Sequence, residues 1–177
     1  MTKLKIGAFG VNFEINVIQT IKILADYIRD IKGKYQERKD ISNWLDRAQK
    51  QFESGQYTLV PMSTDRAISI IDKNNMSKQD KELYNSLLII KGIAQNLDGH
   101  YKEAVETLNK VTLSDHLISV AWNNKGLAQA NLNMYEDAVE SFDRAIESNK
   151  SNPVDKDSLK YQFPLFSMAY NNKGNAL

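Results

Sequence analysis

The stretch Ala121-Trp-Asn-Asn-Lys-Gly-Leu-Ala128 decides the fold, because it returns as Ala169-Tyr-Asn-Asn-Lys-Gly-Asn-Ala176 and has a weaker copy around Lys91-Gly92. Residues 85–118 align with residues 119–152 without a gap, at a period of 34 residues. A motif that recurs at a fixed period of this length predicts a repeat architecture. The identical pairs in the alignment include Lys91/Lys125, Gly92/Gly126, Ala94/Ala128, Gln95/Gln129, Tyr101/Tyr135, Ala104/Ala138, Val105/Val139 and Glu106/Glu140.

Residues 119–152 resemble the tetratricopeptide repeat, a unit of two antiparallel helices. Lys125 and Gln129 depart from the family pattern, which has Leu and Tyr at these positions, and Lys91 and Gln95 make the same departures. The resemblance implies an all-α fold of tetratricopeptide-like helix-turn-helix repeats, stacked as a short right-handed α-solenoid and preceded by an N-terminal helix. The residues that carry it are Trp122, Gly126, Ala128, Tyr135, Ala138, Phe142, Ala145 and Pro153.

We expect residues 1–40 to hold the N-terminal helix and residues 41–177 to form the array. Within the array, residues 85–118 and 119–152 are clear repeats, residues 41–74 a degenerate repeat and residues 165–177 the first helix of an incomplete one. Helices are predicted over residues 77–97, 101–112, 116–131 and 135–148, with Ser77 and Asp80 capping the first of them and an irregular insertion following Pro153.

The degenerate repeat keeps only part of the pattern. Trp44, Gly55 and Tyr57 have the spacing of three residues in the clearest repeat, and a first helix is expected to open near Ile41. We expect the second helix to begin at Ser63, so that extra residues after Tyr57 break the period. Its inner side is predicted to carry Ala67, Ile68, Ile70 and Ile71.

Apolar residues recur at helical spacing between Phe13 and Tyr35, which predicts the N-terminal helix. The apolar stripe is wide, and a helix that is apolar on more than one side is usually buried. Two interpretations remain open. The helix is a cap that packs against the first repeat, or it is a dimerisation element. The seam consists of Val17, Ile21, Leu24, Ile28, Ile31 and Tyr35.

Composition and charge exclude several classes of protein. With 177 residues and 42% hydrophobic content, the chain can bury a core. The 23 basic and 22 acidic residues nearly cancel, so no field attracts nucleic acid or an anionic membrane. Cysteine is absent, which excludes disulfides and thiolate metal sites. No apolar run is long enough to span a membrane, and we expect a cytoplasmic protein.

The resemblance also implies a concave groove lined by the first helix of each repeat. Asparagine dominates the projected lining, and its amide can pair with the main chain of an extended peptide. Asn123, Asn124, Asn171 and Asn172 could instead be solvated or bond within the array. The lysine that precedes each repeated glycine suits a structural role at least as well as ligand binding. The projected groove residues are Ile89, Ile93, Asn96, Val120, Asn123, Leu127, Asn131, Asn171 and Asn175.

No motif supports catalysis, and we predict that the protein is not an enzyme. His100 and His116 are the only histidines, and neither has a helix-spaced partner for a metal. Asp98 and Asp115 beside them are more simply explained as turn and cap residues. We therefore expect no metal and no cofactor.

The leading hypothesis is a protein–protein interaction adaptor or scaffold that binds a peptide segment or a partner protein in the groove. In tetratricopeptide domains that clamp an acidic chaperone tail the groove carries Lys and Arg, which the projected positions lack, so that ligand is disfavoured. The alternatives are a structural self-assembly unit, such as a homodimer formed through a terminal helix, and a peptide-sensing regulatory module of a longer protein.

Overall fold

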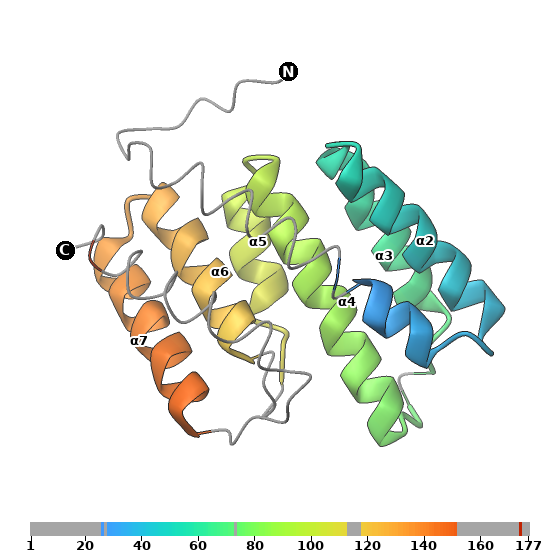
Figure 1. Ribbon diagram of the computed structural model, residues 1–177. Coiled ribbons are helices and arrows are strands. Elements are labelled where there is room, and N and C mark those ends of the chain that lie inside the picture. Colours follow the sequence, from blue (N-terminus) through green and yellow to red (C-terminus); the bar gives the residue numbers. More distant parts are fainter. Residues whose placement is uncertain (1–25, 27, 73, 113–117, 152–173, 175–177) are drawn as a thin grey trace.

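In the computed structural model the described residues are 26, 28–72, 74–112, 118–151 and 174, and these contain helices and no strand (Figure 1). The predicted all-α class is therefore confirmed. Helical residues 28–34 come first, and the predicted insertion after Pro153 lies outside the described residues. The elements that follow are α2 (Lys39–Glu53), η1 (Tyr57–Leu59), α3 (Val60–Ser69), α4 (Lys78–Leu97), α5 (Tyr101–Leu108), α6 (Ile118–Asn131) and α7 (Tyr135–Ser151).

The helices form three hairpins that stack in sequence order (Figure 1). Helix α2 packs on α3, α4 on α5, and α6 on α7, and these pairs coincide with residues 41–74, 85–118 and 119–152, which we call repeats 1, 2 and 3. Between hairpins, α3 contacts α4, and α5 contacts α6. Helices α4 and α6 also touch directly, so the first helices of repeats 2 and 3 share one face of the stack.

The three hairpins turn in the same way. The residue at the turn has a positive φ of 72° at Gly55, 82° at Gly99 and 61° at Asn133. In each turn the next amide N–H donates to the carbonyl oxygen of a glutamine five residues earlier, at 2.8 to 2.9 Å. This is a helix C-terminus closed by a left-handed residue, for which Gly and Asn are the favoured side chains. The glutamines are Gln51, Gln95 and Gln129.

A side-chain hydrogen bond fixes the register of repeat 1. The Ser63 hydroxyl donates to Gln51 Oε1 at 2.8 Å, and the Ser141 hydroxyl donates to Gln129 Oε1 at 2.6 Å. Both pairs are buried and span the same number of residues, so repeats 1 and 3 share one internal register. Val60 then takes the position that alanine has in the other repeats.

Two predictions for repeat 1 are wrong. Helix α3 begins at Val60 rather than Ser63, and Pro61 lies in its first turn, where a missing N–H removes no helical hydrogen bond. The extra residues follow α3 instead of preceding it, since 44 residues separate Gln51 from Gln95 and 34 separate Gln95 from Gln129. Ile70 ends the helix 39% exposed, whereas its predicted companions Ala67, Ile68 and Ile71 are buried.

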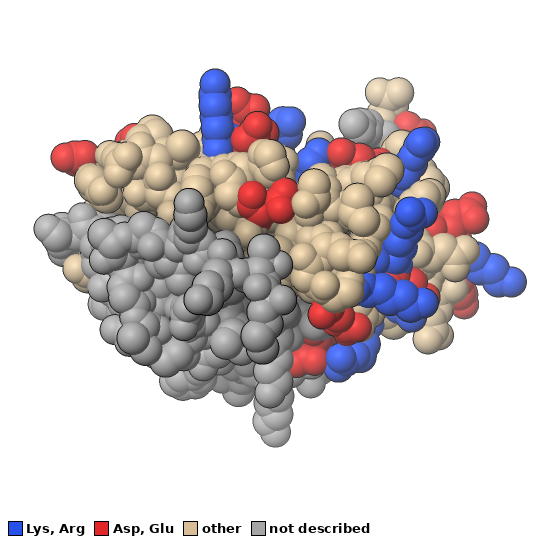
Figure 2. Space-filling model, turned by 90° about the horizontal axis from the view of Figure 1, so that it is seen from above, with Lys and Arg blue, Asp and Glu red and all other residues tan. Residues whose placement is uncertain are grey.

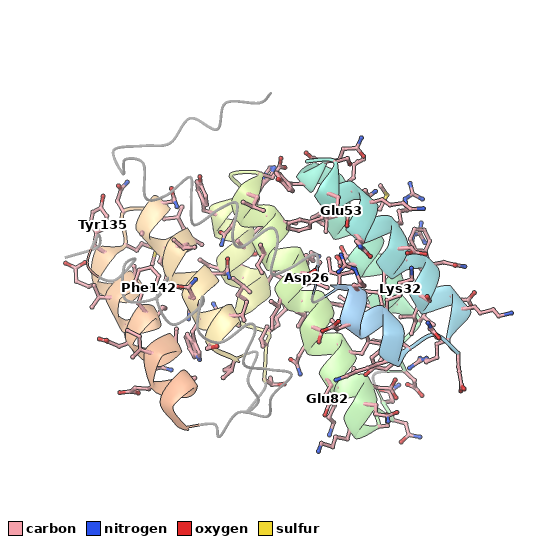
Figure 3. All side chains as sticks on the ribbon, viewed as in Figure 1. Asp26, Lys32, Glu53, Glu82, Tyr135 and Phe142 are labelled. Carbon is pink, nitrogen blue, oxygen red and sulfur yellow. The ribbon has the colours of Figure 1, made fainter. Side chains whose placement is uncertain are left out.

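Glycine brings the two helices of a hairpin close together. A Cβ built on Gly92 would lie 2.6 Å from Leu108 Cγ, and one built on Gly126 would lie 2.5 Å from Phe142 Cε1. Figure 3 shows Phe142 on α7, beside α6. Since the second helix packs directly on the glycine backbone, these positions admit no larger residue without a shift.

Helical residues 28–34 pack on the front of α2 and α4 (Figures 1 and 3). Ile28 and Ile31 are buried in the core cluster that these helices share. Lys32 pairs with Asp46 on α2, and the Tyr35 hydroxyl donates to the Gln79 oxygen on α4 at 2.8 Å. The described part of the N-terminal helix is thus arranged as a cap on the first repeats.

Helix α4 begins at the predicted capping residues. The Ser77 hydroxyl accepts from the Asp80 N–H, and the Asp80 carboxylate accepts from the Ser77 N–H. Arg38 also pairs with Asp80, which links the segment before α2 to the start of α4. Among the described residues, no helix has both the length and the apolar character needed to cross a membrane.

Candidate protein-binding groove

The adjacent faces of α4 and α6 form the candidate groove. The Asn96 Nδ2 donates across the two helices to the main-chain oxygen of Asn124 at 2.7 Å. Asn124 is buried, and its own Nδ2 donates to the Val120 oxygen at 2.9 Å. This pair of bonds sets the relative position of α4 and α6. It also shows that Asn124 bonds within the array, which was one of the interpretations that the sequence left open.

Four of the predicted groove positions are buried in the folded chain, which corrects the projection of these residues onto an open surface. Ile89, Ile93 and Val120 belong to the main core cluster, together with the isoleucines of the N-terminal helical residues. Asn123 is 1% exposed. Burial of an aliphatic side chain stabilises a fold by about 1.5–3 kcal/mol, which explains why the chain covers this part of the face.

Three predicted positions keep access to solvent in the described residues. Asn96 and Leu127 are partly exposed, and Asn131 is exposed. Asn131 Nδ2 donates to the Leu127 oxygen at 2.8 Å, so these two residues lie on one face of α6, a helical turn apart. Asn171 and Asn175 lie outside the described residues.

The acceptor side of the Asn96 amide is unsatisfied. Its Oδ1 is buried and, like Gln95 Oε1, has no hydrogen-bond partner among the described residues. An unpaired buried acceptor costs about 1–3 kcal/mol relative to a paired one. Among the predicted groove residues that the structure describes, Asn96 therefore offers an amide oxygen that an N–H donor would stabilise. Leu127 and Asn131 follow Asn124 along α6.

Residues 119–152 match the family profile of the tetratricopeptide repeat. The chain carries a tetratricopeptide repeat. The matched residues form the hairpin of α6 and α7. Repeats 1 and 2 have the same internal register as this hairpin. No curated protein and no solved structure matches the chain. Tetratricopeptide repeats serve in general as protein–protein interaction modules, and the all-helical hairpins of this chain are of that kind.

The departures from the tetratricopeptide pattern have structural partners. The Lys91 Nζ lies 2.7 and 2.8 Å from the two carboxylate oxygens of Asp65 on α3. The Lys125 Nζ lies 4.6 Å from the Trp122 ring centroid, and the Arg144 guanidinium lies 4.7 Å from it. Burial, and then the Arg144 charge, lower the pKa of Lys125. Lys91 thus joins α4 to α3, whereas Lys125 contacts Trp122 on its own helix and Arg144 of α7 contacts the same ring.

The described residues offer no group of three metal-ligating side chains. His100 lies in the turn between α4 and α5, with its Nε2 3.1 Å from an oxygen of Asp98. The Thr58 hydroxyl donates to the other Asp98 oxygen at 3.0 Å, which links the turns of two repeats. His116 lies outside the described residues. The absence of catalytic function stays a prediction.

Proposed function

We propose that this tetratricopeptide-repeat chain is an adaptor that binds an extended segment of a partner protein on the α4–α6 face. The observation that carries the proposal is the Asn96 amide, which is held by its Nδ2 bond to Asn124 and retains an unsatisfied Oδ1. Because this oxygen is buried, a main-chain N–H of a bound segment would donate to it after the atoms that cover it had moved aside. Leu127 supplies apolar contact from α6, and Asn131 offers an exposed amide one turn further along that helix.

The proposed groove selects its ligand without charge. Its three accessible predicted residues are uncharged, so they would bind the main chain and the apolar side chains of the ligand. Binding is expected to change little with salt, because no ion pair contributes to it. The proposal includes no catalytic step.

The test uses a peptide selected from a displayed random library against the intact chain, and measures its affinity by fluorescence anisotropy. Asn96→Ala and Leu127→Ala are each expected to weaken binding at least about tenfold, which corresponds to about 1.4 kcal/mol. Asn109→Ala is the matched control, since Asn109 is exposed at the end of α5. If both groove variants bind as tightly as the parent chain, with unchanged circular dichroism, the proposed groove is wrong.

Self-assembly through the N-terminal helix is the weaker hypothesis. Among the described residues of that helix, Ile28 and Ile31 would have to leave the core cluster to make contact with a second copy, whereas Val17, Ile21 and Leu24 lie outside the described residues. A regulatory role within a longer protein stays a prediction, as does a homodimer.

A further inference from the structure

The outer face of α3 differs from the equivalent faces of the other repeats. In the shared register, Leu59 takes the position of Glu103 and Asp137, and Met62 takes the position of Glu106 and Glu140. Leu59 is 39% exposed and Met62 49% exposed. An exposed methionine adds little to the stability of a hairpin in which glutamate serves equally well. The fold therefore does not account for these two side chains.

The same face lacks the ion pair that repeat 3 has. In α7, Arg144 pairs with Glu140 four residues earlier at 2.7 Å. In α3, Arg66 has Met62 at that position. Leu59, Met62, Arg66 and Ile70 follow one another at intervals of three or four residues, so they share one side of the helix.

An open surface depression of about 630 Å³, between α2 and the turn that leads to α3, meets this stripe at Leu59. Leu59 lines it together with Arg47 and Lys50. Asp46, which also lines it, already pairs with Lys32. Figure 2 shows Lys and Arg side chains, interspersed with Asp and Glu, toward the right-hand edge of the described surface, the end at which α2 and α3 lie in Figure 1.

We propose that this basic and apolar face of repeat 1 is a second docking surface, which binds an acidic amphipathic helix of a partner protein. Carboxylates of the partner would pair with Arg47, Lys50 and Arg66. Its apolar side chains would cover Leu59, Met62 and Ile70. This second surface shares no residue with the proposed groove, and the chemistry of its ligand is different.

The charge pattern of the face favours a protein ligand over a membrane. Basic and apolar side chains together also suit an anionic bilayer. Arg47 and Lys50 share the open depression with the carboxylate of Asp46, however, so a ligand with separate carboxylates fits it better than a continuous anionic surface does. Carboxylates at the equivalent positions of repeats 2 and 3 would repel an acidic helix, so repeat 1 alone is suited to it.

The experiment uses a labelled synthetic peptide with leucines at helical spacing and glutamates between them, and measures its anisotropy with the full chain. We expect binding that weakens as salt is raised, and a loss of at least about tenfold for Met62→Glu and for Arg47→Glu. Met62→Glu should fold, because glutamate is the residue of both other repeats at this position. Met62→Leu is the matched control and should retain binding.

Four results would overturn the inference. Equal affinity of Met62→Glu and the parent chain would show that the peptide binds elsewhere. Equal affinity for a peptide with glutamines in place of glutamates would remove the charge argument. Binding to phosphatidylserine vesicles that Met62→Glu abolishes, without peptide binding, would identify a membrane. A solution mass that falls in Met62→Glu, without peptide binding, would identify a second copy of this chain. The uncharged groove is tested separately by Asn96→Ala, which should not change binding of this peptide.

Discussion

Replacing Gly126 by alanine is expected to destabilise the protein, although alanine is the better helix former. The new Cβ would lie 2.5, 2.7 and 2.9 Å from three ring atoms of Phe142. Ordinary contact begins near 3.4 Å, so the nearest ring atom must retreat by close to one ångström. Phe142 is almost fully buried, which leaves its ring little freedom to move.

The expected magnitude is the difference between two opposing effects. Overpacking of this kind costs about 1–3 kcal/mol. Alanine recovers up to about 1 kcal/mol of helix propensity relative to glycine. The net effect of Gly126→Ala is therefore a loss of roughly 1–2 kcal/mol. Gly33 provides the control, because it is helical and a Cβ there meets nothing within 4 Å. Gly33→Ala should stabilise the protein by up to about 1 kcal/mol.

The assay is urea unfolding followed by far-ultraviolet circular dichroism, for both variants and for a double-mutant cycle with Phe142→Ala. Removal of the ring costs about 3–5 kcal/mol by itself. In that background Gly126→Ala has no ring to displace, and its effect should change sign and become stabilising. The reasoning is refuted if Gly126→Ala stabilises the parent chain, or if its effect is the same with and without the Phe142 ring.

Three further outcomes follow from the hairpins and the cap. Ser141→Ala should cost about 1–3 kcal/mol in urea unfolding, because it leaves Gln129 Oε1 buried without its donor, and an effect below that of an exposed Ser→Ala change would contradict the bond. Gly99→Ala should cost about 1–2 kcal/mol of stability, because alanine is strained at the positive φ of this turn. Asn133→Gly, at the matching turn, should change stability by less than about 0.5 kcal/mol. Equal effects of the two substitutions would mean that backbone strain is unimportant at these turns. The Ser77 hydroxyl, and then Arg38, lower the pKa of Asp80 below its unfolded value near 4. The stabilisation of the folded state by these two interactions is therefore complete above about pH 4, and it is lost as pH falls through the folded pKa of Asp80. Acid titration of the thermal midpoint should show this loss in the parent chain and a smaller one in Asp80→Asn.

The fold of repeats 2 and 3 could be predicted because it depends on local, periodic requirements. A glycine at the helix contact and a left-handed turn residue leave direct marks in the sequence. Repeat 1 is harder to predict, because Ala48 replaces the glycine of the other repeats and Val60 replaces the alanine near the start of their second helix. The Gln51 and Ser63 pair, at the spacing of Gln129 and Ser141, was the signal that could have placed α3 correctly.

The candidate site was less predictable, because burial depends on contacts between distant segments. Projection onto an open stack treats Ile89 and Ile93 as surface residues. In the structure they share a core with Ile28 and Ile31, about 60 residues earlier in the chain. No periodic pattern within a repeat records such a contact. The apolar seam of the N-terminal helix indicated that some face of the array would be covered, without indicating which.

Both proposals rest on positions where one repeat has a residue that serves the hairpin less well than its counterparts do. At one position the three repeats have Phe52, Asn96 and Ala130. Phe52 is buried against the edge of Tyr57, with ring centroids 5.3 Å apart, whereas Asn96 places an unpaired acceptor there. Met62 exposes apolar surface where glutamate would be solvated. The bond from Asn96 Nδ2 to Asn124 accounts for one side of the Asn96 amide. A bound partner would satisfy its oxygen and would cover Met62. The two sites differ in charge, so salt dependence separates their ligands in a single titration.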